Sequence, residues 1–89
     1  MATVYIPSMM RKFTAGAEKV EVEGATVRQL IRNLDLMHPG VKGWLVEGHR
    51  LKPNISVAVD GTVSSLGLLE SVSEEAEVHF VAAISGGAG

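Results

Sequence analysis

The sequence closes with Glu77-Val78-His79-Phe80-Val81-Ala82-Ala83-Ile84, followed by Ser85-Gly86-Gly87-Ala88-Gly89. The first part alternates apolar side chains with others at the spacing of a strand, which predicts a strand over 77–84 with Val78 and Phe80 facing a core. The five residues after it contain no large side chain that could pack, so we expect a flexible tail. The residues therefore predict one domain over 1–84 and a tail over 85–89.

Three earlier segments show the same alternation. Residues 3–7 and 18–23, joined by a loop over 8–17, predict an antiparallel hairpin. Residues 55–59 alternate too, and the Asp60-Gly61 pair that follows them is favoured in tight turns. We expect strand 3–7 to lie beside strand 77–84 at the centre of one sheet.

A single strong helix is predicted between the second and third strands. Thr26 followed by Gln29 is a capping-box pattern, and His38-Pro39-Gly40 ends the helix because the residue before proline avoids helical geometry. The apolar side chains at helical spacing are Val27, Leu30, Ile31, Leu34 and Met37. After the helix we expect a short turn that buries Trp44 and Leu45, then an exposed loop over 47–50. One amphipathic helix on one face of a mixed sheet gives an α+β fold.

Length and composition indicate a small globular domain. The chain has 89 residues, of which 46% are apolar and 20% charged, within the globular rather than the disordered range. It has no cysteine, which excludes disulfides, thiolate metal sites and a cysteine nucleophile within this chain. No apolar run reaches the roughly 18 residues of a membrane span, and no signal peptide is visible, so we expect a cytoplasmic protein.

The charges are segregated along the chain. All eight Lys and Arg lie between Arg11 and Lys52, and every charged residue after Pro53 is acidic. The acidic half is either a solvated surface or a face that approaches a basic partner. In both cases we expect no nucleic-acid binding by this half.

The side chains give no active site. The three histidines, His38, His49 and His79, lack metal-ligand spacing, and we expect no metal site. Glu74, Glu75 and Glu77 fit surface charges better than an acid/base pair. Neither a nucleophile elbow nor a phosphate-binding glycine loop is present. We therefore expect that the chain is not an enzyme.

The C-terminal glycines are different. A glycine backbone can pass through a narrow channel, because it lacks Cβ and adopts either sign of φ. An ionised carboxylate is a poor electrophile, so acyl chemistry at this terminus would need ATP and an enzyme. Gly86-Gly87 alone is a weak motif, and taken alone it fits an inert Gly/Ala tail or an expression remnant better than a functional terminus.

Three segments together resemble the MoaD/ThiS sulfur carriers, and most closely their CysO-like branch. These are the closing segment 77–87, the opening Val4-Tyr5-Ile6-Pro7-Ser8-Met9-Met10-Arg11, and Asn54-Ile55-Ser56-Val57-Ala58-Val59-Asp60-Gly61. The resemblance spans nearly the whole chain apart from residues 41–53. It implies a ubiquitin-like β-grasp fold.

The resemblance also implies a function. An adenylating enzyme of the ubiquitin-activating type would use ATP to activate Gly87 in the Gly86-Gly87 pair, and sulfur transfer would make a thiocarboxylate. No cofactor would be bound by the chain itself. A sulfur-accepting synthase of cysteine, molybdopterin or thiamin-type biosynthesis would then take the sulfur.

Partner docking is implied for the end of the last strand. The residues concerned are His79, Val81, Ile84 and Ser85. Val81 has an alternative as an inward residue on the other face of the sheet.

The chain departs from the family at its end, because Ala88-Gly89 follow the diglycine. A JAMM-type metalloprotease could cleave between Gly87 and Ala88. Alternatively, Gly89 is the functional terminus, or the two residues are an artefact. Two other functions remain open: a protein modifier conjugated through the diglycine, and a β-grasp binding domain with an inert tail.

Overall fold

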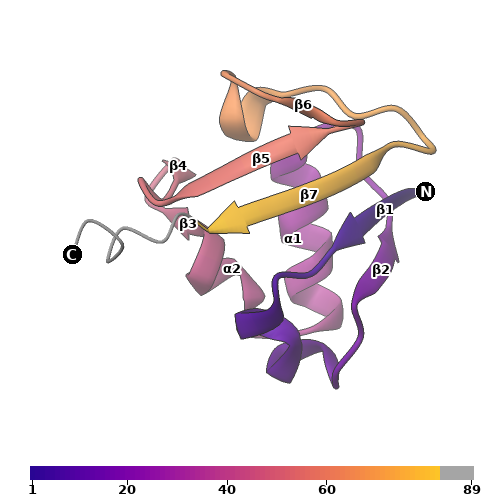
Figure 1. Ribbon diagram of the computed structural model, residues 1–89, viewed down its shortest axis with the longest axis vertical. Coiled ribbons are helices and arrows are strands. Elements are labelled where there is room, and N and C mark those ends of the chain that lie inside the picture. Colours follow the sequence, from indigo (N-terminus) through magenta and orange to yellow (C-terminus); the bar gives the residue numbers. More distant parts are fainter. Residues whose placement is uncertain (83–89) are drawn as a thin grey trace.

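The computed structural model describes residues 1–82 of the chain. Figure 1 shows a mixed sheet in front with the longest helix, α1, lying behind it. The five strands of this sheet are β1 (Ala2–Tyr5), β2 (Lys19–Val22), β5 (Ile55–Val59), β6 (Thr62–Val63) and β7 (Glu77–Ala82), in the spatial order β2-β1-β7-β5-β6. The expected α+β arrangement of one main helix on one face of a mixed sheet is confirmed.

Shorter elements connect these strands around α1 (Val27–Met37). They are the 3₁₀ helices η1 (Ser8–Thr14) and η2 (Gly67–Leu69), the helix α2 (Val41–Leu45), and a small hairpin of β3 (Val46–Glu47) and β4 (Arg50–Leu51). None of the helices within residues 1–82 is long and apolar enough to cross a membrane.

The first and last strands lie side by side at the centre of the sheet, as expected. β1 runs parallel to β7 with Val4 opposite Val78, and β5 runs antiparallel to β7 with Val57 opposite Phe80. All four of these side chains are buried. Their alternation with exposed neighbours turns one face of the sheet toward α1 and leaves the other face open.

The main helix begins where the capping pattern predicts. Thr26 Oγ1 accepts a hydrogen bond from the Gln29 N–H at 3.2 Å. Gln29 Oε1 accepts from the Ala25 N–H at 2.8 Å, one residue before the cap. The helix ends at Met37 with His38 as its C-cap, directly before Pro39. Its buried residues are Val27, Leu30, Ile31 and Leu34.

Two expectations about burial are wrong. Met37 is 53% exposed; it is the last residue of α1, and the chain leaves helical geometry directly after it. Trp44 is 38% exposed, whereas Leu45 is fully buried as predicted. A helix of five residues has one inward-facing pair at i, i+4, and Val41 and Leu45 occupy it.

Two segments expected as loops contain regular structure. Within residues 8–17, Ser8–Thr14 form η1, which buries Met10 and Thr14. The Thr14 hydroxyl donates a hydrogen bond to the Ala17 carbonyl oxygen at 3.0 Å. The turn over 47–50 closes the β3–β4 hairpin. By contrast, the tight turn at Asp60-Gly61 is confirmed, with φ values of 51° and 86°.

Candidate functional site

The outward side chains of β7 lie on the face of the sheet that α1 does not cover. Val78 and Phe80 are buried under α1, so His79 and Val81 project to the opposite side. Val81 is 54% exposed. Val81 could have faced outward or been an inward residue on the other face of the sheet, and the structure supports the outward position. Its side chain is therefore accessible to a partner protein.

Tyr5 extends this surface across the β1–β7 boundary. It lies opposite His79 in the parallel register, and the two rings stack with their centroids 4.1 Å apart and 4° between their planes. Sequence reasoning did not include Tyr5 in the site. The signal was present, since Tyr5 alternates with Val4 and Ile6, and pairing Val4 with Val78 places Tyr5 beside His79.

The same row of side chains continues to the edge of the sheet. His79 pairs with Ala58 of β5, and Ala58 pairs with Val63 of β6, which is 67% exposed. We call this surface the open face; it consists of Tyr5, Ala58, Val63, His79 and Val81. An aromatic stack with exposed aliphatic side chains on a rigid sheet is the composition of a protein-docking surface.

A small cavity of about 200 Å³ lies where β7 ends. Ala82, the last described residue, forms part of its wall. The other lining residues are Pro7, Met9, Met10, Trp44, Lys52, Asn54 and Ile55. We call it the exit cavity, because the chain leaves the described structure beside it.

Trp44, which lines the exit cavity, packs against a second aromatic ring. The rings of Trp44 and Phe13 are tilted by 54° with centroids 6.3 Å apart, and Lys12 Nζ lies 5.4 Å from the centroid of each ring. Trp44 and Met9, which is 51% exposed, are therefore accessible apolar groups next to the chain exit.

The described side chains do not assemble a metal centre. No group of three or more His, Asp or Glu within residues 1–82 is placed to hold a metal ion. The three histidines belong to separate elements: His38 follows α1, His49 lies in the β3–β4 turn, and His79 lies on β7.

The remaining residues predicted for the site lie outside the described part of the chain. These are Ile84, Ser85, Gly86, Gly87 and Ala88. The structure therefore places His79 and Val81, the two residues predicted for docking, but not the predicted reactive terminus.

Comparison with known proteins identifies the family. The model of the ThiS family matches residues 4–87, from the first strand through the diglycine. The chain belongs to the ThiS family. It is thus one of the ubiquitin-like sulfur carriers of the MoaD/ThiS type, whose members are small carrier proteins rather than catalysts. A search of curated protein sequences gives no match.

Solved structures agree with this family in fold. A chain of the Amycolatopsis orientalis BexX/CysO complex superposes with a TM-score of 0.91 and 31% identity, over 96% of this ThiS-family chain and 98% of that one. CysO of Mycobacterium tuberculosis gives a TM-score of 0.87 at 24% identity, over 94% and 100% of the two chains. The small archaeal modifier protein 1 of Methanosarcina acetivorans gives 0.77 at 18% identity, over 94% and 93%. The ubiquitin-like β-grasp fold is confirmed by these similarities.

Proposed function

We propose that this chain carries sulfur as a thiocarboxylate on Gly87 and donates it to a biosynthetic enzyme. The observation that supports this most is the extent of the family match, which runs through residue 87 and includes the diglycine. β7 is the central strand of the sheet and the last element before the diglycine in the sequence (Figure 1). Its outward side chains belong to the open face. In this proposal the body of the protein is the part that an enzyme recognises, and the C-terminal residues are the part that reacts.

The chemistry requires activation of the terminal carboxylate. The reference pKa of an α-carboxyl is roughly 3.3–3.7, so the group is ionised and unreactive at neutral pH. An activating enzyme of the ubiquitin-activating type would transfer AMP from ATP to the carboxylate oxygen and release pyrophosphate. A sulfide equivalent would then attack the carbonyl carbon, and AMP would leave with the electron pair of the C–O bond. We propose that this chain itself binds no cofactor, and that the ATP is held by the enzyme.

Two residues follow the proposed acceptor, and they must be removed first. The family match ends at residue 87, whereas the sequence continues with Ala88-Gly89. We propose cleavage of the Gly87–Ala88 bond by a JAMM-type metalloprotease. The full-length chain would then be an inactive precursor.

The open face is the surface we assign to the activating enzyme. Val81 and the Tyr5–His79 stack offer an apolar and aromatic patch, and they lie on the same strand pair that leads to the terminus. Docking there would fix the position of the chain end, so that the carboxylate reaches the nucleotide in a reactive geometry. Ile84 and Ser85, which follow Ala82-Ala83 in the sequence, would complete the contact.

For the sulfur acceptor we favour a synthase of cysteine biosynthesis. Of the structures described above, the one with the highest TM-score comes from a BexX/CysO complex, and the next is CysO of Mycobacterium tuberculosis. Molybdopterin and thiamin-type pathways use carriers of the same family type and are the alternatives that genomic neighbours would distinguish.

Intact mass spectrometry of the protein isolated from its native host tests the proposal. We expect a species ending at Gly87, part of which has gained the mass difference between sulfur and oxygen. Recovery of only the 89-residue form while the pathway is active would contradict processing. A mass consistent with attachment to lysines of other proteins would instead assign the chain as a protein modifier.

Variants of the chain end separate the individual steps. A chain truncated after Gly87 should be adenylated in vitro without any protease, while the full-length chain should not react. Gly87→Ala in the truncated chain should stop or greatly slow activation, because a Cβ would obstruct a channel shaped for glycine. Equal adenylation of the 87- and 89-residue chains would assign Gly89 as the functional terminus.

A further inference from the structure

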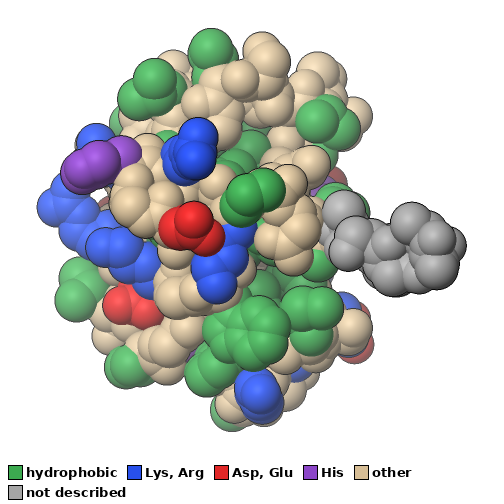
Figure 2. All heavy atoms as spheres, turned by 90° about the vertical axis from the view of Figure 1, so that its left-hand side faces the viewer, with side chains coloured by type: hydrophobic (Ala, Val, Ile, Leu, Met, Phe, Trp, Pro, Cys, Tyr) green, Lys and Arg blue, Asp and Glu red, His purple; other side chains and the backbone are tan. Residues whose placement is uncertain are grey.

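A second concave site lies apart from both the open face and the exit cavity. It has a volume of about 240 Å³ and is enclosed by α1, the start of α2, the β3–β4 hairpin and η2. It shares no lining residue with the exit cavity. Figure 2 shows Lys and Arg side chains gathered beside a histidine on this side of the molecule.

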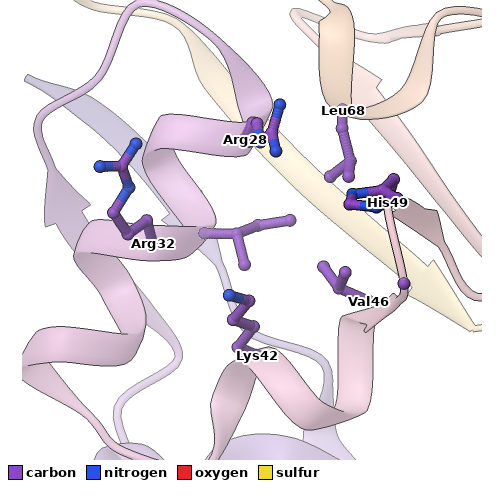
Figure 3. A pocket seen from close by; sticks show the side chains of 8 residues that line it. Arg28, Arg32, Lys42, Val46, His49 and Leu68 are labelled. Carbon is purple, nitrogen blue, oxygen red and sulfur yellow. The ribbon is translucent and has the colours of Figure 1, made fainter.

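Basic side chains from three elements converge on this cavity. Arg28 and Arg32 come from α1, Lys42 from α2, and His49 from the hairpin turn. In Figure 3, Arg28, Lys42 and His49 extend toward the cavity, while Arg32 lies at its side. No carboxylate is among the lining residues, so the cavity concentrates positive charge.

Two carboxylates near the elements that enclose the cavity accept hydrogen bonds from groups outside it. Asp35 Oδ1 accepts hydrogen bonds from the N–H groups of Gly40 and Lys42 at 3.1 and 3.0 Å. Glu70 Oε1 accepts from the Ser64 hydroxyl at 2.5 Å. Glu47 lies opposite Arg50 in the β3–β4 register, and neither residue lines the cavity. The cations that line the cavity are therefore available to a ligand.

The remaining walls of the cavity are apolar. Ile31 and Leu68 are buried, Val46 is partly buried, and all three line the cavity. Figure 3 shows Leu68 and Val46 between the charged groups. An apolar wall lowers the local dielectric constant, which strengthens the attraction between an anion and the surrounding cations. The volume is below the range of roughly 300–1,000 Å³ that is typical of sites for drug-sized ligands. It suits a compact anion.

We infer that this cavity binds a phosphate group, either as inorganic phosphate or as the head of a small phosphomonoester. A guanidinium such as that of Arg28 matches phosphate oxygens with two parallel hydrogen bonds, and Lys42 adds a point charge from the facing element. His49 donates a further N–H. A doubly charged tetrahedral anion satisfies donors that converge from several directions better than a planar, singly charged carboxylate does.

The test is a titration of the full-length, isotope-labelled protein followed by amide NMR at constant ionic strength. The probes are inorganic phosphate, glycerol 3-phosphate and a triglutamate peptide. We expect saturable shifts confined to the amides around Arg28, Lys42 and His49 with one or both phosphate probes. Tighter binding of glycerol 3-phosphate would identify a phosphomonoester as the ligand class, and tighter binding of inorganic phosphate would identify the free anion.

Matched variants separate a site from general electrostatic attraction. Arg28→Gln and Lys42→Gln should each weaken phosphate binding by about tenfold, which is the loss of one charge-assisted contact. Lys12→Gln and Lys19→Gln remove the same charge elsewhere and should leave the affinity within about twofold. Equal losses in all four variants, shifts spread over every basic residue, or saturation by the triglutamate peptide alone would each overturn the inference.

Discussion

Tyr5 and His79 stack ring on ring across the boundary between β1 and β7, 4.1 Å apart and nearly parallel. The two residues are 74 positions apart in the chain but directly opposite in the sheet. Both are partly exposed on the open face. The stack therefore couples the first strand to the last one at the surface that we assign to the activating enzyme.

The stack should contribute measurably to stability. Tyr5→Thr, His79→Thr and the double variant form a double-mutant cycle, followed by urea denaturation. We expect a coupling free energy of about 0.5–1 kcal/mol, typical of aromatic and cross-strand pairs. Thr keeps the strand propensity of both positions, so a coupling near zero would mean that the rings touch without stabilising each other.

A charge on the open face should impair activation without unfolding the protein. Val81→Asp places a carboxylate on an exposed position, so the free energy of unfolding should change by less than about 1 kcal/mol. Its kcat/KM in adenylation of the 87-residue chain should fall at least about tenfold, because a docked carboxylate would be desolvated without a partner. Leu69→Asp, at a position 71% exposed on η2, is the control and should react like the wild type. A wild-type rate for Val81→Asp would remove the open face from the docking assignment.

Gly40 is a position where a side chain should not fit. Its φ is 109°, and a Cβ there would lie 2.7 Å from Cδ1 and Cε1 of Phe13. Gly40→Ala should lower the free energy of unfolding by about 2–4 kcal/mol, through backbone strain and steric overlap together. Gly48→Ala, with a φ of 66° and no atom near the new Cβ, should cost only about 1 kcal/mol. If the overlap is real, adding Phe13→Leu to Gly40→Ala should cost less than the sum of the two single changes.

Asp35, near the end of α1, forms hydrogen bonds with the start of α2. Its Oδ1 accepts from two backbone N–H groups, those of Gly40 and Lys42. Asp35→Ala should destabilise the protein by about 1–2 kcal/mol, and Asp35→Asn, which keeps an acceptor oxygen, by about half as much. Glu75→Ala, an exposed acidic position, should change stability by less than about 0.5 kcal/mol. Chemical denaturation of the three variants gives the comparison, and equal losses for Asp35→Ala and Glu75→Ala would show that these hydrogen bonds stabilise nothing.

The sheet and the main helix could be predicted because their patterns are local. The alternation of apolar residues predicted that the side chains of Val4, Val78 and Phe80 point into the core. The Thr26–Gln29 pattern predicted where α1 begins. The short elements could not be predicted in the same way. Met10 is buried by the 3₁₀ helix η1, which is too brief to show a period, and Trp44 is exposed because its short helix has room for only two inward residues.

The candidate site was only partly predictable for a related reason. His79 and Val81 follow from the alternation of one strand, but Tyr5 joins them only through a pairing between distant strands. The basic cavity was not predicted. Its residues Arg28, Lys42 and His49 come from three elements, and sequence spacing does not indicate that these elements pack together.

The central place of β7 has a mechanical consequence. This strand is held on both sides, by three residue pairs with β1 and five with β5. A pull on its C-terminal end acts along the strand axis, so the hydrogen bonds of both ladders resist together in shear and cannot be unzipped one by one. An enzyme that binds the C-terminal end and applies a force to it would therefore act on a strand that resists separation from the sheet. We expect the sheet to stay folded while the terminus is bound in an active site.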